Sequence, residues 1–127
     1  MRFTYLTASV VFVLLISNLV AETVGAWRFD ADEDGCKCRP LLSIERDQNG
    51  VPSGTIAFPG AKVPLHNISV TTKNNEETLQ FTVEQPENDK SITYYYQASI
   101  DGDIMTGEYH QRDSTQTLAF HARRHKR

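Results

Sequence analysis

The sequence is poor in the residues and motifs that identify many functional classes. It holds two cysteines and one tryptophan, and its formal net charge at pH 7 is −3. Two cysteines exclude a disulfide-dense scaffold, and the weak negative charge argues against binding to nucleic acid. The histidines have no metal-ligand spacing, and no nucleophile elbow, phosphate-binding loop or paired-acid motif occurs. We therefore predict no enzymatic activity and no cofactor.

The N-terminal segment has the features of a secretory signal peptide. Arg2 supplies a positive charge, and residues 6–20 form a largely apolar run. The run is shorter than the ~20 apolar residues of a membrane span, and no basic cluster follows it as a stop signal. Small residues favour cleavage after Ala26, with Ala21 as the alternative. We predict a signal peptide over residues 1–26 and a secreted, extracellular protein; an uncleaved anchor is the competing interpretation.

Helical periodicity is absent after the signal peptide, whereas apolar and polar residues alternate repeatedly. The clearest alternating segment is 78–84, and others lie at 42–45, 55–58, 92–100, 105–109 and 118–122. Turn residues separate these segments, with Asp101-Gly102-Asp103 as the strongest hairpin signal. Short connections of this kind predict an antiparallel up-and-down meander of about seven to eight strands, which removes its exposed edges by closing.

The predicted fold class is therefore all-β, as a small β-barrel or a barrel-like sandwich. We place this β-barrel domain at 41–122, after an acidic, cysteine-containing segment at 27–40 and before a basic tail at 123–127. Such a tail is usually solvated, and the functional alternative is contact with an anionic surface or trimming. The expected interior residues are Ile44, Ile56, Phe58, Leu79, Phe81, Val83, Ile92, Tyr94, Tyr96, Leu118 and Phe120.

Several pieces of the chain resemble a calycin-like meander of secreted proteins. They are Gly54-Thr55-Ile56, Val63-Pro64-Leu65, 79–83, 101–107 and 120–123. Gly25-Ala26-Trp27 is similar to the glycine-x-tryptophan motif at the start of lipocalin-like barrels. The resemblance implies a small calycin-like barrel and implies no activity.

Cys36-Lys37-Cys38 is the most unusual local pattern. In an extracellular compartment, two cysteines favour one disulfide. Residues two apart on a strand lie about 7 Å apart, at the limit of what a disulfide bridges. A strained Cys36–Cys38 disulfide, linkage to other chains, a soft-metal dithiolate and free thiols all remain open.

The acidic residues before these cysteines match the first half of a calcium-binding loop. Asp30, Asp32 and Asp34 occupy the first, third and fifth ligand positions, and Gly35 follows as the turn residue. The twelfth position is Leu41, where such a loop needs a bidentate glutamate. Weak calcium binding by these three aspartates competes with the interpretation of a solvated acidic segment.

Three further features have both a functional and an ordinary interpretation. Asn67-Ile68-Ser69 is an acceptor for N-glycosylation if the host is a eukaryote. Alternation points Tyr95 outward, as a ligand contact or as an ordinary exposed tyrosine. Glu108 and His110 share a strand face, as an acid–base pair or as solvent-facing neighbours.

These observations predict a secreted, non-enzymatic protein that acts through its surface. Its partner would be an unknown extracellular protein or matrix component, in an interaction, matrix, venom or effector role. The alternative is a carrier that holds a small apolar ligand in a lipocalin-like barrel, an analogy at the level of the fold. An enzyme would require a cleft with perturbed carboxylates or histidines.

Overall fold

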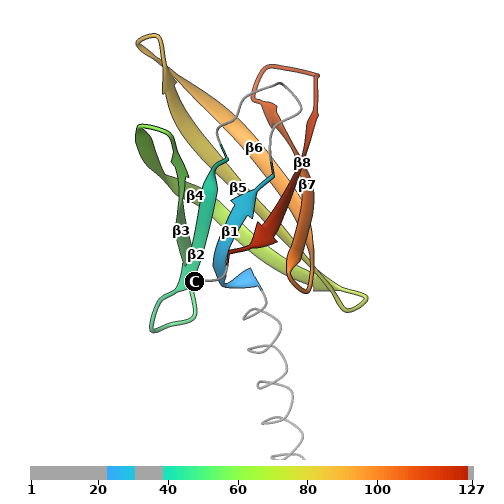
Figure 1. Ribbon diagram of the computed structural model, residues 1–127. Coiled ribbons are helices and arrows are strands. Elements are labelled where there is room, and N and C mark those ends of the chain that lie inside the picture. The colour runs from blue at the N-terminus through green and yellow to red at the C-terminus, as the bar shows by residue number, and fades with distance from the viewer. Residues whose placement is uncertain (1–22, 31–38, 126–127) are drawn as a thin grey trace, which may run out of the picture.

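The computed structural model describes residues 23–30 and 39–125. They form a closed barrel of eight antiparallel strands that follow one another around the wall in sequence order (Figure 1). The all-β prediction is confirmed, in its barrel form. The strands are β1 (Gly25–Phe29), β2 (Leu41–Arg46), β3 (Pro52–Phe58), β4 (Ala61–Lys73), β5 (Glu76–Glu87), β6 (Lys90–Asp101), β7 (Ile104–Gln111) and β8 (Leu118–Arg124). No helix among these described residues is long and apolar enough to cross a membrane.

The barrel has two ends, which the connections between strands define. The β3–β4, β5–β6 and β7–β8 connections lie at what we call the upper end, and the β2–β3, β4–β5 and β6–β7 connections lie at the lower end (Figure 1). Asn74 and Asn75 turn β4 into β5 with φ angles of 54° and 65°. Two successive residues with positive φ give the turn a twist that matches the right-handed twist of the flanking strands. This short turn therefore allows β4 and β5 to pair as a long hairpin. Gly102 has φ of 62° in the predicted hairpin between β6 and β7.

None of the alternating segments found in the sequence covers β4. Its pairing with β5 shifts between His66 and Ser69, where a β-bulge interrupts the ladder. Val63 and Leu65 pack on the core before the bulge, and Ile68 and Val70 do so after it. The apolar face therefore changes from odd to even positions, and this shift hides the period of two.

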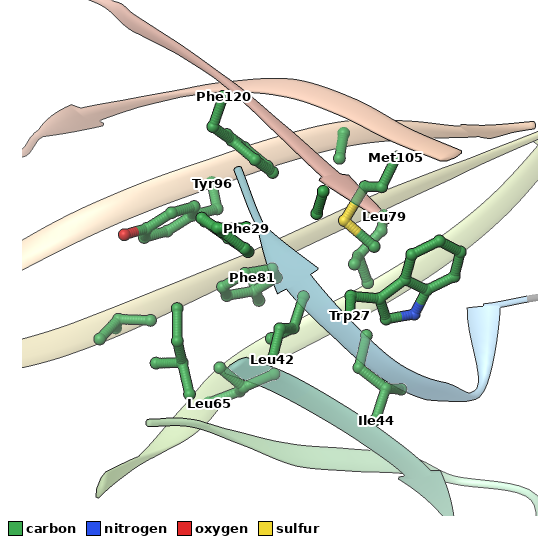
Figure 2. Packing of buried hydrophobic residues seen from close by; sticks show 14 of the residues in the cluster. Trp27, Phe29, Leu42, Ile44, Leu65, Leu79, Phe81, Tyr96, Met105 and Phe120 are labelled. Carbon is green, nitrogen blue, oxygen red and sulfur yellow. The ribbon is translucent and has the colours of Figure 1, made fainter. Parts of the chain in front are cut away.

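The core occupies the interior of the barrel, where side chains from the surrounding strands pack together (Figure 2). Its buried residues are Trp27, Phe29, Leu42, Ile44, Ile56, Leu65, Leu79, Phe81, Val83, Tyr96, Ala98, Ile100, Met105, Phe120 and Ala122. Four predicted interior residues, Phe58, Ile92, Tyr94 and Leu118, are only half-buried. All four lie at the upper end of their strands, where the wall extends beyond the packed centre.

The barrel extends beyond the predicted range of 41–122 on both sides. Strand β1 pairs with β2 and also with β8, so residues 25–29 close the barrel. Arg123 and Arg124, which the sequence placed in a basic tail, belong to β8. Lys126 and Arg127 lie outside the described residues.

Candidate functional site

A hollow of about 420 Å³ lies at the upper end of the barrel. Tyr94 on β6 and Tyr109 on β7 line it, with ring centroids 6.3 Å apart. Gln111 Nε2 donates a hydrogen bond of 3.3 Å to the Tyr94 hydroxyl, which orients both side chains. Gln116, from the β7–β8 connection, and Leu118, at the start of β8, complete the aromatic and amide lining. We call this the upper hollow.

Stacked aromatic rings lie beneath the upper hollow. Tyr96 has its ring centroid 5.0 Å from that of Tyr109 and 4.8 Å from that of Phe81. Phe120 stacks on Phe29 at 4.7 Å. Figure 2 shows Phe29, Phe81, Tyr96 and Phe120 gathered on one side of the core, apart from Trp27. These rings fill the middle of the barrel, and Tyr109 is the member of the stack that also lines the upper hollow.

A second hollow, of about 570 Å³, lies on the outer face of the wall. Strand register brings its lining together, since Tyr95 pairs with Thr82 on one side and with His110 on the other. Gln97 and Glu108 form the neighbouring row. We call this hollow the outer groove. Its lining combines aromatic rings with amide and hydroxyl groups that donate and accept hydrogen bonds.

Tyr95 and His110 stack in the outer groove, with ring centroids 5.3 Å apart and an angle of 22° between the ring planes. Tyr95 keeps 38% of its surface exposed, as its predicted outward direction requires. Glu108 and His110 both line the groove, and the ring partner of His110 is Tyr95. His110 also lines the upper hollow, so this residue separates the two sites.

Asn67 lies on the rim of the outer groove. It is an exposed residue of the β-bulge, with φ of 54°, a conformation that asparagine tolerates better than most residues. Its Nδ2 atom donates a hydrogen bond of 3.3 Å to Thr82 Oγ1. The sequence identified Asn67 and Tyr95 separately, and the structure places them in the same groove.

Of the residues predicted to hold calcium, the structure describes only Asp30. Its backbone N–H donates to the carbonyl oxygen of His121 at 2.8 Å, and its carboxylate lies 3.9 Å from Arg123 Nε. Asp32, Asp34, Cys36 and Cys38 lie outside the described residues. Within the described part of the chain, no group of three or more histidine, cysteine or acidic residues is placed to hold a metal ion.

The lower end carries a buried polar cluster that the sequence did not indicate. Trp27 is fully buried, and its Nε1 donates to the carbonyl oxygen of Thr23 at 3.0 Å. The Thr23 hydroxyl donates to the carboxylate of Glu77, which is also buried. Arg124 lies over the Trp27 ring, 4.3 Å from its centroid. This cluster lies at the end of the barrel opposite the upper hollow.

Gly25 gives Arg124 the room that this arrangement needs. Its φ is +139°, and a Cβ atom at this position would come within 2.8 Å of Arg124 Nη1. The Gly25-Ala26-Trp27 motif thus has a structural role at the point where the chain enters the barrel.

Comparison with known proteins yields no relative: no family model, no curated protein and no solved structure matches the chain.

Proposed function

We propose that the protein is a secreted, non-enzymatic extracellular protein that acts by binding a protein or matrix partner at the upper end of its barrel. The upper hollow carries this proposal. Its volume of about 420 Å³ falls within the range of small binding sites, roughly 300–1,000 Å³. Tyrosine rings and amide groups line it, and tyrosine is enriched where proteins bind one another.

The packed aromatic interior of the barrel favours a surface role over the enclosure of a large ligand. Phe81 and Tyr96 are buried and stacked on each other, and Tyr96 also stacks on Tyr109, which lines the hollow. A partner can therefore insert one or two side chains into the hollow, while the rest of the contact spreads over the rim. The exposed Gln111 and Gln116 offer donors and acceptors for such a rim.

A calycin-like relationship is part of the same proposal. The closed barrel of eight strands in sequence order supports it, as does the Gly25-Ala26-Trp27 motif at the first strand. These features concern the fold and supply no ligand.

Site-specific photo-crosslinking in the extracellular medium of the source tests the proposed binding surface. A benzophenone side chain would replace Gln116, which is exposed at the upper hollow, or Thr106, which is exposed outside both hollows. We expect a discrete crosslinked partner from position 116 and none from position 106. The Gln111→Ala substitution should weaken the crosslink from position 116. Identical products from both positions would contradict binding at the upper end.

A carrier of a small apolar ligand is the second candidate. The closed barrel of eight antiparallel strands favours it, as an analogy at the level of the fold. Native mass spectrometry of the protein purified from its source separates the two functions. A lipid bound in stoichiometric amount would favour the carrier, and a ligand-free mass together with the crosslink from position 116 would favour the surface role.

A further inference from the structure

Asn67, the acceptor residue of the glycosylation motif, lines the outer groove, and this placement supports a further inference. The inference rests on the proposed secretion of the chain and is independent of partner binding at the upper hollow. Asn67 Nδ2 lies at the groove rim, 3.3 Å from Thr82 Oγ1. Ser69 completes the motif on the other side of the bulge and is exposed. A glycan attached here begins at the groove, because the bulge directs the Asn67 side chain to the outer face.

The row of side chains beyond Thr82 leads from Asn67 to the aromatic pair. Thr82 pairs with Tyr95 across β5 and β6, and Tyr95 pairs with His110 across β6 and β7. Neighbouring strands lie about 4.8 Å apart, so Tyr95 is only about 10 Å from the strand that carries Asn67. The inner sugars of an attached glycan can span this distance without leaving the surface.

The lining suits a neutral sugar chain. A pyranose ring has an apolar face of C–H groups and a rim of hydroxyl groups. Tyr95, which is 38% exposed and lies beside His110, offers an aromatic surface to the apolar face of the sugar. Gln97 offers both a donor and an acceptor to the hydroxyl groups of the sugar. Glu108 adds an acceptor, and no lysine or arginine lines the groove among the residues described.

We propose that Asn67 is N-glycosylated and that the inner sugars of its glycan lie in the outer groove against Tyr95. The donor is an oligosaccharide linked to a lipid through pyrophosphate. A bond forms between Asn67 Nδ2 and the anomeric carbon of the first sugar, and the bond from that carbon to the pyrophosphate oxygen breaks. The lipid pyrophosphate leaves with the electron pair, and Nδ2 loses one proton. The glycan covers the groove of about 570 Å³ and shields it from other partners.

Secretion of the full chain from eukaryotic cells provides the test. The intact mass should show one N-glycan, which the Ser69→Ala substitution removes. On the folded protein, a peptide-N-glycosidase should release the glycan about three- to tenfold faster from Tyr95→Ala than from the wild type, the range expected for one aromatic contact. Tyr95→Phe keeps the ring and should release it at the wild-type rate.

Ile104→Ala is the matched control, because Ile104 is an exposed apolar residue outside the groove. It should leave the release rate unchanged, and circular dichroism verifies that each variant is folded. An unmodified Asn67 would overturn the proposal. Equal release rates for the wild type and Tyr95→Ala would also overturn it, since the glycan would then extend into solvent. A partner protein crosslinked to the groove of the glycosylated chain would do the same.

Discussion

The Arg124 side chain connects β8 with two segments of the lower end, namely the start of β1 and the turn between β6 and β7. Its guanidinium lies over Trp27 and donates to the Val24 carbonyl at 2.9 Å and to the Gly102 carbonyl at 3.3 Å. Its Nε donates to the Asp103 carboxylate at 2.9 Å. The side chain is only 24% exposed, so these contacts are partly desolvated and stronger than those of a surface ion pair.

Arg124→Ala should therefore lower the free energy of unfolding by about 2–3 kcal/mol, from the lost cation–π contact and charged hydrogen bonds. Urea unfolding followed by circular dichroism measures the effect. Arg123→Ala is the neighbouring control, because its side chain is 75% exposed and its nearest carboxylate lies 3.9 Å away. That change should stay within about 0.5 kcal/mol of the wild type. Equal effects for both variants would show that Arg124 does not hold the lower end together.

At the scale of strands, Gly107 lets β6, β7 and β8 pack closely. A Cβ atom at this position would lie 2.2 Å from the Gln97 carbonyl oxygen and 2.8 Å from the Phe120 ring. The carbonyl belongs to the backbone and cannot rotate away. Gly54 is confined in a similar way, with a Cβ atom 2.2 Å from the Ser43 carbonyl oxygen. Both glycines in strands mark sites where neighbouring chain segments approach closely.

Gly107→Ala should accordingly destabilise the barrel by more than about 2 kcal/mol, because the ladder between β6 and β7 must shift. Thermal unfolding compares it with Gly102→Asn. Gly102 has φ of +62°, a Cβ atom at this position would meet no other atom within 4 Å, and asparagine tolerates this conformation. The control should therefore cost less than about 1 kcal/mol. A Gly107→Ala barrel as stable as this control would contradict the close approach.

Strands with an uninterrupted alternation of apolar and polar residues could be predicted from the sequence. Strand β4, which contains a bulge, and strand β1, which overlaps a cleavage motif, could not. Strands β5 and β6 followed the alternation, and the short turn at Gly102 fixes the register that places Tyr95 beside His110. The bulge at Asn67 changed the inward face of β4, so its pattern was lost. Gly25 and Ala26 fit a cleavage site as well as a strand, and local sequence cannot distinguish these two roles.

The shapes of the two hollows were harder to predict from the sequence than the strand register that brings their lining residues together. The outer groove depends on the curvature of four neighbouring strands around the bulge, and the upper hollow depends on where the β7–β8 connection places Gln116. Neither shape follows from the alternation of apolar and polar residues. The sequence indicated Asn67 and Tyr95 as separate exposed residues, and only the paired strands show that they share a surface.

For the molecule as a whole, barrel closure bears on where a signal peptide can be removed. Gly25 and Ala26 pair with Ile44 and Ser43 on β2. The carbonyl oxygens of Thr23 and Val24 accept hydrogen bonds from Trp27 and Arg124. Cleavage after Ala26 would remove Thr23, Val24, Gly25 and Ala26, together with the hydrogen bonds that they make. It would also place a charged amino terminus on the buried Trp27. The loss of several hydrogen bonds at about 1 kcal/mol each is large against a total stability of roughly 5–15 kcal/mol.

If the proposed signal peptide is removed, we expect cleavage after Ala21, so that the mature chain begins at Glu22 and Thr23–Ala26 remain in the barrel. Intact mass and N-terminal sequencing of the secreted protein measure this directly. A chain that begins at Glu22 should unfold cooperatively in urea, whereas a chain that begins at Trp27 should unfold at much lower urea concentration, because β1 then lacks its first pairs with β2. A secreted protein that begins at Trp27 and is equally stable would mean that the barrel closes without these residues.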